Sequence, residues 1–338
     1  MRSFSFSHCV CGRLRETLEH EMFVPMLKVS VNGSFNESLT TQSFAHMPDS
    51  SLWPANGQLA LSIVVNVEEG SELTLADGDR GPDPVDELGV ILRRPVRNFG
   101  NESNYRYGIR AGAPRVMRLL DKYQVPATFT AAALSLERAP ELARAIREGD
   151  HEVCSHGWRW MMQDRMNEEE ERAFIRRAKD SIEASVGAAP VGWLSRYMHT
   201  ERTRNLLAEE GFGYHMDDYS DDAPYWDASV SPPMVVLPYA LDSNDMKMWT
   251  DAALSPRAWL EYAKDTFEWL LAEAQHEPRM MSLGVHLRII GRPGRIGYLE
   301  QFLAYARSKP NVWFARRADI AERFRSASPA VNQQGAAI

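Results

Sequence analysis

Cysteine is scarce in this chain of 338 residues, which contains only Cys9, Cys11 and Cys154. Three cysteines do not make a disulfide framework, so they favour a reducing compartment. The Cys9 and Cys11 pair lacks the second pair of ligands that would complete a zinc site. The N-terminus also lacks the pattern of a secretory signal peptide. We therefore expect a cytoplasmic protein.

Long apolar runs and an excess of positive charge are missing as well. No run approaches the ~20 apolar residues of a membrane-spanning helix, so no membrane partner is expected. The 38 lysines and arginines are outnumbered by 46 aspartates and glutamates, and the formal net charge of −8 argues against nucleic-acid binding. The apolar share of 44% and charged share of 25% are typical of soluble globular proteins. A small molecule is the expected partner.

The first 55 residues differ in composition from the rest of the chain. Residues 32–51 are rich in polar and turn-forming residues and show no sustained period. We expect residues 1–55 to form an extension, or an arm that packs on a neighbouring subunit. Residues 56–326 are expected to form the main domain, and 327–338 a C-terminal tail.

From Leu59 onwards, strand and helix patterns alternate about seven times. This alternation predicts parallel strands joined by crossover helices, in a barrel or a doubly wound sheet. No G-x-G-x-x-G motif follows the first strand, which disfavours a nucleotide-binding sheet. Strands are predicted at 59–67, 126–134, 151–157, 191–195, 212–218, 234–239, 279–287 and 311–317. Helices are predicted at 111–124, 140–149, 168–186, 200–211, 256–274, 294–308 and 317–325, the third with a capping box of Asn167 and Glu170.

Polar residues follow most of the predicted strands. In a barrel of this kind, active residues lie at the carboxyl ends of the strands, so the pattern predicts one shared site. The residues concerned are Asn66, Glu68, Glu69, His156, Ser195, Arg196, Asp217, Asp218, Asp242, Asn244, Asp245, His286 and Arg288.

Several of these residues have both a functional and a structural interpretation. Two carboxylates as close as Glu68 and Glu69 cannot both ionise cheaply in a dry pocket, so one pKa is expected to rise toward that of a general base. The alternative is a solvated strand end. For His156 and His286, the functional interpretation is a role in catalysis, and the structural one is a histidine buried in the core. Arg288 fits a solvated loop or a buried clamp on a carbonyl or carboxylate group.

Five short motifs occur in a characteristic order: NVEEG (66–70), SHG (155–157), GWLS (192–195), DDAPY (221–225) and LGVH (283–286). With these motifs the chain resembles the polysaccharide deacetylase family, and within it the allantoinase-analogue branch of purine catabolism. The resemblance runs from about residue 52 to 325. It implies a distorted (β/α)7-type barrel, hydrolase activity and a homo-oligomeric assembly.

The resemblance also implies roles for individual residues. Metal-dependent members use two adjacent aspartates, an H-x-x-x-H histidine pair and a late histidine that acts as the acid. The matching positions are Glu68 for the base, Glu69 and His156 for metal ligands, Trp160 for the second histidine of the pair, and His286 for the acid. Both aspartates are therefore glutamates here, and the second histidine is a tryptophan, which cannot bind a metal.

The tryptophan leaves few candidate ligands for zinc. Catalytic zinc usually has three protein ligands, whereas Glu69 and His156 supply two at most. The expected site therefore holds no tightly bound metal and no other cofactor, with zinc as the alternative. His151, His199 or His215 would complete a zinc site only if the fold brought one of them close.

We weighed three functions. The first is hydrolysis of a carbon–nitrogen bond in a cyclic amide or ureide such as allantoin. Water activated by Glu68 or Glu69 would attack the ring carbonyl, His156 would hold water or substrate, and His286 would protonate the leaving nitrogen. The second is metal-dependent deacetylation of an amino sugar or another N-acyl compound. The third is binding without catalysis. The expected substrate-binding residues are Asn66, Trp160, Trp193, Arg288 and Asp217.

Overall fold

The computed structural model describes residues 52–54, 57–85, 87, 89, 94–249 and 253–330. Of the predicted arm at 1–55 only residues 52–54 are described, and of the predicted tail at 327–338 only residues 327–330. Within the described part, nine strands form one sheet in the order β6-β7-β5-β4-β3-β2-β1-β8, with β9 beside the start of β1. The strands are β1 (Leu59–Val67), β2 (Ala127–Ala131), β3 (Glu152–Ser155), β4 (Gly192–Trp193), β5 (Tyr214–His215), β6 (Tyr225–Asp227), β7 (Met234–Val236), β8 (Arg279–His286) and β9 (Val312–Phe314).

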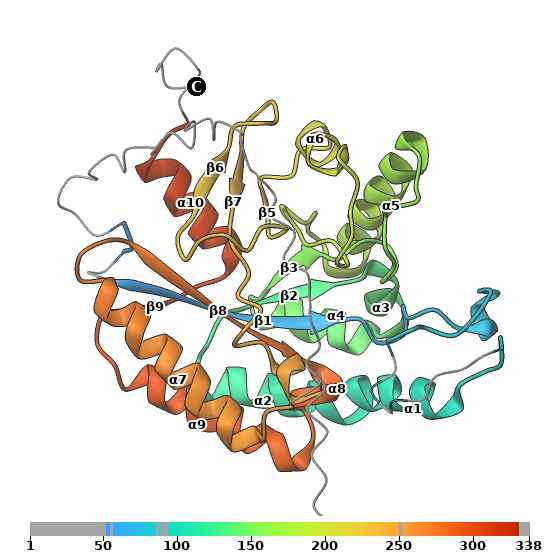
Figure 1. The fold of residues 1–338 in the computed structure, drawn as a ribbon, viewed down its shortest axis with the longest axis horizontal. Helices are drawn as coiled ribbons and strands as arrows, with labels where there is room; N and C mark the ends of the chain where they lie inside the picture. Colours follow the sequence, from blue (N-terminus) through green and yellow to red (C-terminus); the bar gives the residue numbers. More distant parts are fainter. Residues whose placement is uncertain are drawn as a thin grey trace, which may run out of the picture. The chain divides into compact units, whose positions relative to one another are not determined.

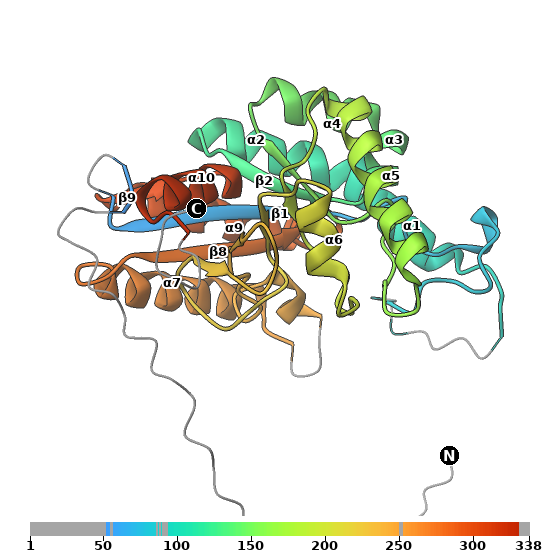
Figure 2. The ribbon, with the colours of Figure 1, turned by 90° about the horizontal axis from the view of Figure 1, so that it is seen from above.

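Helices surround the curled sheet (Figure 1). In Figure 2, α7 lies outside β8, while α2 and α4 lie outside β2 at the other side of the molecule. The α-helices are α1 (Phe99–Tyr107), α2 (Ala113–Tyr123), α3 (Ala133–Arg138), α4 (Pro140–Glu148), α5 (Glu168–Val186), α6 (Thr203–Glu209), α7 (Pro256–Glu273), α8 (Leu287–Ile290), α9 (Pro293–Arg307) and α10 (Arg317–Ala327). Shorter elements are the 3-10 helices η1 (Leu75–Asp77) and η3 (Asp245–Met248) and the π-helix η2 (Gly108–Gly112).

The longest strand is β1, all nine residues of which are buried. Its β-branched, apolar sequence LALSIVVNV is typical of a strand that is covered on both faces. It pairs in parallel with β2 on one side and with β8 on the other. The register with β8 sets Asn66 opposite His286, so the carboxyl ends of these two strands are level.

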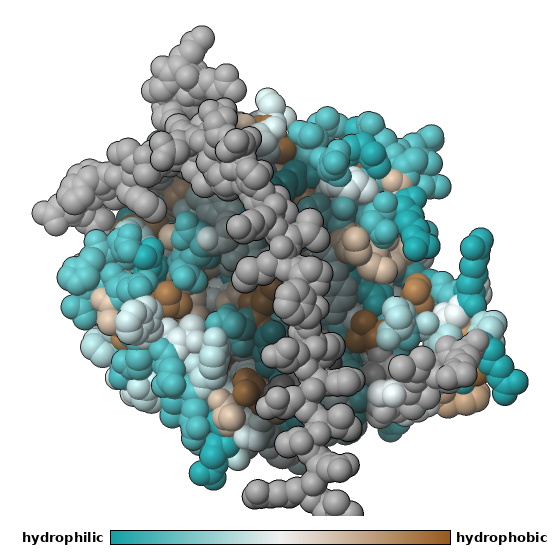
Figure 3. Space-filling view, viewed as in Figure 1, coloured by the Kyte–Doolittle hydropathy of each residue, from teal (hydrophilic) through white to brown (hydrophobic). Residues whose placement is uncertain are grey.

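The predicted α/β fold of parallel strands and crossover helices is confirmed, as a curled, parallel-rich half-barrel. The antiparallel exception is β6, which pairs with β7 at one edge. The main apolar core packs β1, β2 and β8 against α2, α4, α7 and α9. On the face seen in Figure 3, hydrophilic residues cover the periphery and hydrophobic residues show only as small patches.

Some element boundaries differ from the prediction. The capping box of Asn167 and Glu170 at the start of α5 is confirmed. The strand predicted at 126–134 ends at Ala131, and α3 follows at once. The helix predicted from Thr200 begins at Thr203, and the Thr200 hydroxyl donates a hydrogen bond to the buried carboxylate of Glu171.

The sequence patterns missed α1 and η2. The buried residues of α1 include Asn101, Glu102 and Asn104, so this helix lacks the apolar stripe by which amphipathic helices are predicted. Among the described residues, no helix has both the length and the apolar character needed to cross a membrane.

Close packing between η2 and α8 holds the segment that follows β8. A Cβ atom at Gly112 would lie 2.0 Å from the carbonyl oxygen of Leu287, so alanine cannot be accommodated without a backbone shift. Gly297, inside α9, has no atom within 4 Å of such a Cβ.

We predict that Gly112→Ala lowers the free energy of unfolding by about 1–3 kcal/mol through overpacking. Gly297→Ala is the matched control and should raise it by about 0.5–1 kcal/mol, since alanine is the better helix former. Urea unfolding followed by circular dichroism measures both. Equal effects of the two substitutions would contradict the packing argument.

Candidate active site

Glu68 directly follows β1 and meets two histidines from other strand ends. Its Oε1 lies 3.5 Å from Nε2 of His286, the last residue of β8, and 3.7 Å from Nε2 of His156, which follows β3. All three side chains are at least 93% buried. The convergence predicted from the sequence for these three residues is present in the structure.

His286 is held from behind by Asp245, the first residue of η3. Its Nδ1 lies 2.7 Å from Oδ1 of Asp245, whose Oδ2 accepts a hydrogen bond from the His286 backbone N–H. Burial alone would lower the pKa of His286, but the Asp245 and Glu68 carboxylates raise it to about 10. The imidazole is therefore protonated at neutral pH, with its Nε2–H on the side of Glu68.

Arg288 lies behind Glu68 and is completely buried. Its Nη1 is 2.8 Å from Oε2 of Glu68, and its Nε is 2.6 Å from Oε1 of Glu87. Burial alone would raise the pKa of Glu68, but the charges of Arg288 and His286 outweigh burial and hold that pKa well below its usual range. Glu68 is therefore a carboxylate at neutral pH.

Glu69 points away from the two histidines. Its Oε1 accepts a hydrogen bond from the backbone N–H of Arg288, and its Oε2 accepts one from the backbone N–H of Glu68. Gly108 makes room for it, since a Cβ there would lie 2.3 Å from Oε1. Burial raises the pKa of Glu69 to about 7, with Arg288 opposing and the Glu68 charge adding to the shift. One pKa of the pair is raised, as expected, but in the carboxyl group that does not face His156.

The tautomer of His156 is set by hydrogen bonds at both ring nitrogens. Its Nδ1 is 2.6 Å from the carbonyl oxygen of Leu194, which can only accept, and its Nε2 is 3.0 Å from the indole Nε1–H of Trp160, which can only donate. These partners require the proton on Nδ1 and a lone pair on Nε2. The indole thus occupies the lone pair that a metal ion would use.

Trp160 is itself held between charged groups. The guanidinium carbon of Arg196 lies 3.6 Å from the centre of one of its rings, and that of Arg288 lies 5.7 Å away. Such contacts stabilise a cation over the face of an aromatic ring. Arg196 also donates to the Trp160 carbonyl oxygen and forms a 2.7 Å ion pair with the buried Asp83. The orientation of the indole is therefore set by several interactions.

A cavity of about 250 Å³ opens in front of Glu68. Catalytic candidates form its inner wall, and aromatic and apolar side chains form the rest. The lining residues are Asn66, Glu68, His156, Trp160, Leu194, Ser195, Arg196, Tyr197, Tyr219, Tyr239, Leu241, Asn244, Met246, Lys247 and His286.

Three of the expected substrate-binding residues do not line this cavity. Trp193 is buried against Phe174 and Phe212, because the side chain at this position of β4 faces the helices. The Asp217 carboxylate accepts hydrogen bonds from the backbone N–H and the hydroxyl of Ser195, so it shapes the loop after β4. Arg288 reaches the carboxylates from behind. These placements correct the prediction that all three contact substrate.

Asn66 does line the cavity, but its amide has protein partners. Its Nδ2 donates to the Tyr239 hydroxyl and to the Val285 carbonyl oxygen, and its Oδ1 accepts from the Thr130 hydroxyl. Asn66 therefore ties β1 to β2 and β8 beneath the site.

Sequence reasoning assigned no role to three residues that shape the site. Asp245 was noted only as one of several polar residues after a strand, and its pairing with His286 depends on a contact across 41 positions. Glu87 and Tyr105, which contact Arg288, lie in segments without a recognisable pattern. Tyr105 lies in the stretch NESNYRYGIRAG (101–112), which adds to the resemblance to the polysaccharide deacetylase family.

The donor set does not fit a three-ligand zinc site. In the part of the chain that the structure describes, no three histidine, cysteine or carboxylate side chains are grouped so as to hold a metal ion. Of the histidines that could have completed a site, His151 accepts a hydrogen bond from the backbone of Ala127 and His215 lies 3.5 Å from Asp227. His199 is absent from the cavity wall.

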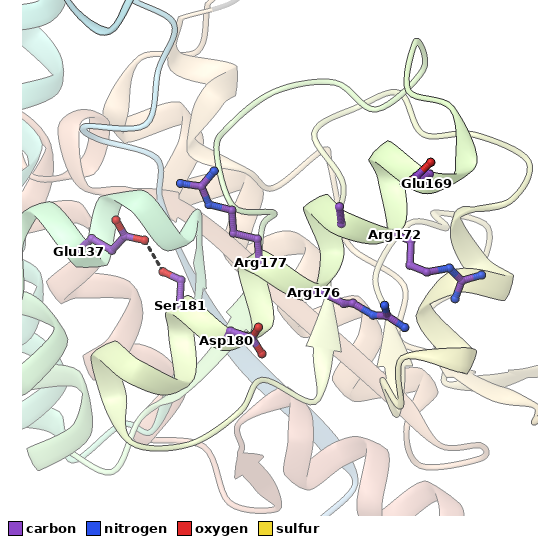
Figure 4. A pocket seen from close by; sticks show the side chains of 8 residues that line it. Glu137, Glu169, Arg172, Arg176, Arg177, Asp180 and Ser181 are labelled. Carbon is purple, nitrogen blue, oxygen red and sulfur yellow. Dashed lines mark hydrogen bonds between the residues drawn. The ribbon is translucent and has the colours of Figure 1, made fainter.

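A second hollow lies over α3 and α5 (Figure 4). Its guanidinium groups already have partners: Arg172 and Arg176 pair with Glu210, and Arg177 lies 3.2 Å over a ring of Trp158. Because none of its residues comes from a strand end, we assign no chemistry to it.

The fold, with a carboxylate and two histidines at its strand ends, is that of a hydrolase of carbon–nitrogen bonds, as comparisons with known proteins show. A model of the polysaccharide deacetylase family matches residues 104–215. A Schizosaccharomyces pombe protein, described provisionally as a polysaccharide deacetylase, is 34% identical over 309 residues, which is 83% of this chain and 94% of that protein. The chain therefore belongs to the polysaccharide deacetylase family.

Two crystal structures are also similar. A Pseudomonas aeruginosa PAO1 protein, described provisionally as a polysaccharide deacetylase, is 39% identical, with a TM-score of 0.79 over 83% of this chain and 96% of that one. PuuE allantoinase is 37% identical, with a TM-score of 0.79 over 84% of this chain and 96% of that one. The expected fold and enzyme class are confirmed, whereas the branch within the family stays a prediction.

We predict that Asp245→Asn lowers the pKa of His286, because it removes the carboxylate against Nδ1. The stabilisation from His286 protonation is complete below its ordinary pKa of about 6.5 and is lost as pH rises through about 10. Asp245→Asn should therefore lower the free energy of unfolding by about 2–3 kcal/mol at pH 7 and by less at pH 10. Urea unfolding at both pH values, with NMR titration of His286, measures this.

The control for this prediction is Asp242→Asn, which removes a carboxylate that accepts from the exposed Tyr262 hydroxyl. It should show no such pH dependence. A destabilisation by Asp245→Asn that is constant from pH 7 to pH 10 would contradict the assignment.

We predict that Trp160→Phe releases His156 from its single tautomer, because phenylalanine keeps an aromatic ring but lacks the N–H donor. Nitrogen-15 NMR of the imidazole should show Nδ1 protonated in the unsubstituted protein and a mixture of tautomers in the variant. Trp158→Phe is the control, since the Trp158 N–H bonds to Glu137 on α3. An unchanged His156 spectrum in Trp160→Phe would contradict the assignment.

Proposed function

We propose that this protein hydrolyses a carbon–nitrogen bond of a cyclic amide or ureide, such as allantoin, without a tightly bound metal ion. The observation that carries the proposal is the hydrogen bond from Trp160 to Nε2 of His156. By resemblance, metal-dependent members of the family have a histidine at the position of Trp160. Here that position supplies an N–H donor, so the lone pair of His156 is already used.

Glu68 is the proposed general base. It is ionised, lines the cavity and lies within 3.7 Å of both histidines, so a water molecule in front of it could give up a proton to Oε1 as it adds to a ring carbonyl. The ion pair with Arg288 makes Glu68 a weaker base, but it also ensures that Glu68 starts the reaction unprotonated. When Glu68 accepts the proton and loses its charge, the charge of Arg288 is still opposed by Glu69 and Glu87.

His286 is the proposed acid. Its charged Nε2–H faces the space that Glu68 also faces, where it can stabilise the oxyanion and then protonate the leaving nitrogen. The pKa of about 10 suits this order of events, since an amide nitrogen becomes basic only after the carbonyl carbon is tetrahedral. Asp245 holds the imidazolium in place without facing the cavity.

The size of the cavity supports a small substrate. About 250 Å³ is near the lower end of small-molecule pockets and suits one ring rather than several sugar units. Trp160, Tyr239 and Leu194 offer flat or apolar surface on its walls. The similarity to PuuE allantoinase, which extends over 84% of this chain, agrees with this substrate class.

The second candidate function is metal-dependent deacetylation of an N-acyl compound. It is favoured by the descriptions of the Schizosaccharomyces pombe and Pseudomonas aeruginosa relatives. It requires a third metal ligand, which the described residues do not supply around His156. The homo-oligomer and the cytoplasmic location stay predictions.

We predict that a screen of ureides, hydantoins and cyclic imides finds hydrolysis that persists after treatment with a chelator. Glu68→Gln and His286→Ala should each lower kcat/KM at least 100-fold, because each removes one proton-transfer group. Glu137→Gln is the control, since Glu137 belongs to the second hollow.

Three outcomes would overturn the proposal. Activity that a chelator abolishes and zinc restores would favour the deacetylase. Full activity of Glu68→Gln would remove the base from the mechanism. Tight binding of one ring without turnover would instead indicate a binding protein.

A further inference from the structure

Four side chains that line the cavity carry a formal charge in the structure, and three of them are paired with an opposite charge. The exception is Lys247, which lies on η3 and is half-buried. In the described part of the chain, its ammonium group makes no hydrogen bond or ion pair. The pairs are Glu68 with Arg288 at 2.8 Å, His286 with Asp245 at 2.7 Å, and Arg196 with Asp83 at 2.7 Å.

The position of Lys247 is linked to that of the acid. Asn244 caps η3 through its side chain, and Asp245, the first residue of η3, holds His286. Met246 and Lys247 of the same turn line the cavity. A substrate group that contacts Lys247 would therefore lie at a fixed place relative to His286.

A lysine that lines the cavity and has no ionic partner among the described residues favours an anionic ligand. The rest of the chain opposes this preference, since the formal net charge is −8. Charges on distant surfaces are screened beyond about 8 Å at physiological salt, whereas a half-buried lysine in contact with the ligand is not. The local charge at the cavity is therefore the one that a small ligand meets.

We propose that Lys247 binds a carboxylate group of the substrate, so that the preferred substrate is a cyclic amide or ureide with an acidic substituent. This inference rests on the proposed function and narrows its substrate class. The ammonium group would form a charge-assisted hydrogen bond to one carboxylate oxygen, while the ring lies between Glu68 and His286.

The proposed reaction itself also produces a carboxylate group in the cavity. Addition of water to a ring carbonyl and cleavage of the carbon–nitrogen bond give one carboxyl group on the product, together with a ureido group from a hydantoin or an amine from a simple cyclic amide. A lysine that served only this group would bind the products of charged and neutral rings alike, whereas a lysine that selects the substrate distinguishes the rings before reaction.

The test compares hydantoin-5-acetate with hydantoin-5-acetamide, which have nearly the same shape and differ by one negative charge. The unsubstituted protein should show a KM about tenfold lower for the acetate, as expected for one hydrogen bond between charged groups. Lys247→Met should abolish that ratio by raising the KM of the acetate, and Lys247→Arg should keep most of it.

The control variant is Lys122→Met, which removes the same charge from α2, where Lys122 pairs with Glu300. It should keep the tenfold ratio. A ratio near one in the unsubstituted protein, or a ratio that Lys247→Met leaves intact, overturns the proposal. Loss in Lys247→Met of product inhibition alone, with the KM ratio intact, assigns the lysine to the product and overturns it as well.

Calorimetry separates failure of this inference from failure of the proposed function. If no ring of the whole screen, these two hydantoins included, is hydrolysed, the proposed function fails, but the dissociation constants of both hydantoins still test Lys247. Tighter binding of the acetate that disappears in Lys247→Met supports the carboxylate site without catalysis. Equal binding of the two compounds by both proteins overturns it.

Discussion

The site depends on the burial of one charge, that of Arg288. A guanidinium group removed from water is very costly unless opposite charges and hydrogen bonds replace the solvent. Glu68, Glu69 and Glu87 supply that replacement from two segments distant in sequence, and Tyr105 adds the face of its ring at 4.4 Å. Arg288 therefore brings together the end of β1, the start of the segment after β8, Glu87 and the Tyr105 side chain of α1.

The same charge separates the behaviour of two adjacent glutamates. Glu68 lies against Arg288 and His286 and stays ionised, whereas Glu69 is buried behind it and has a pKa of about 7. Two full negative charges next to each other in a buried site would repel strongly. The positive charge of Arg288 stabilises the ionised form of both carboxyl groups, but it outweighs burial only at Glu68. The site can thus keep one carboxylate facing the cavity and use the other to bind the backbone of Arg288.

The sequence predicted the fold and the catalytic candidates better than the packing between them. The bounds of β1 were predicted to the residue, because β-branched apolar residues fill the whole strand, and Glu68 followed from its end. The direction of side chains was harder to predict from the sequence. Trp193 and Arg288 are close in sequence to residues that line the cavity, but their own side chains do not line it. The helix α1 was missed because it buries polar groups, for which apolar periodicity gives no signal.

Trp160 does more than replace a histidine that could bind a metal ion. Its rings fill the space between the guanidinium groups of Arg196 and Arg288, which lie 3.6 Å and 5.7 Å from ring centres. Replacing Trp160 by histidine would remove the large aromatic face that both cations contact and place a would-be metal ion near two positive charges. Each of these two cations is paired with its own carboxylate, Asp83 for Arg196 and Glu87 for Arg288. The residue at position 160 is therefore tied to two buried ion pairs as well as to His156.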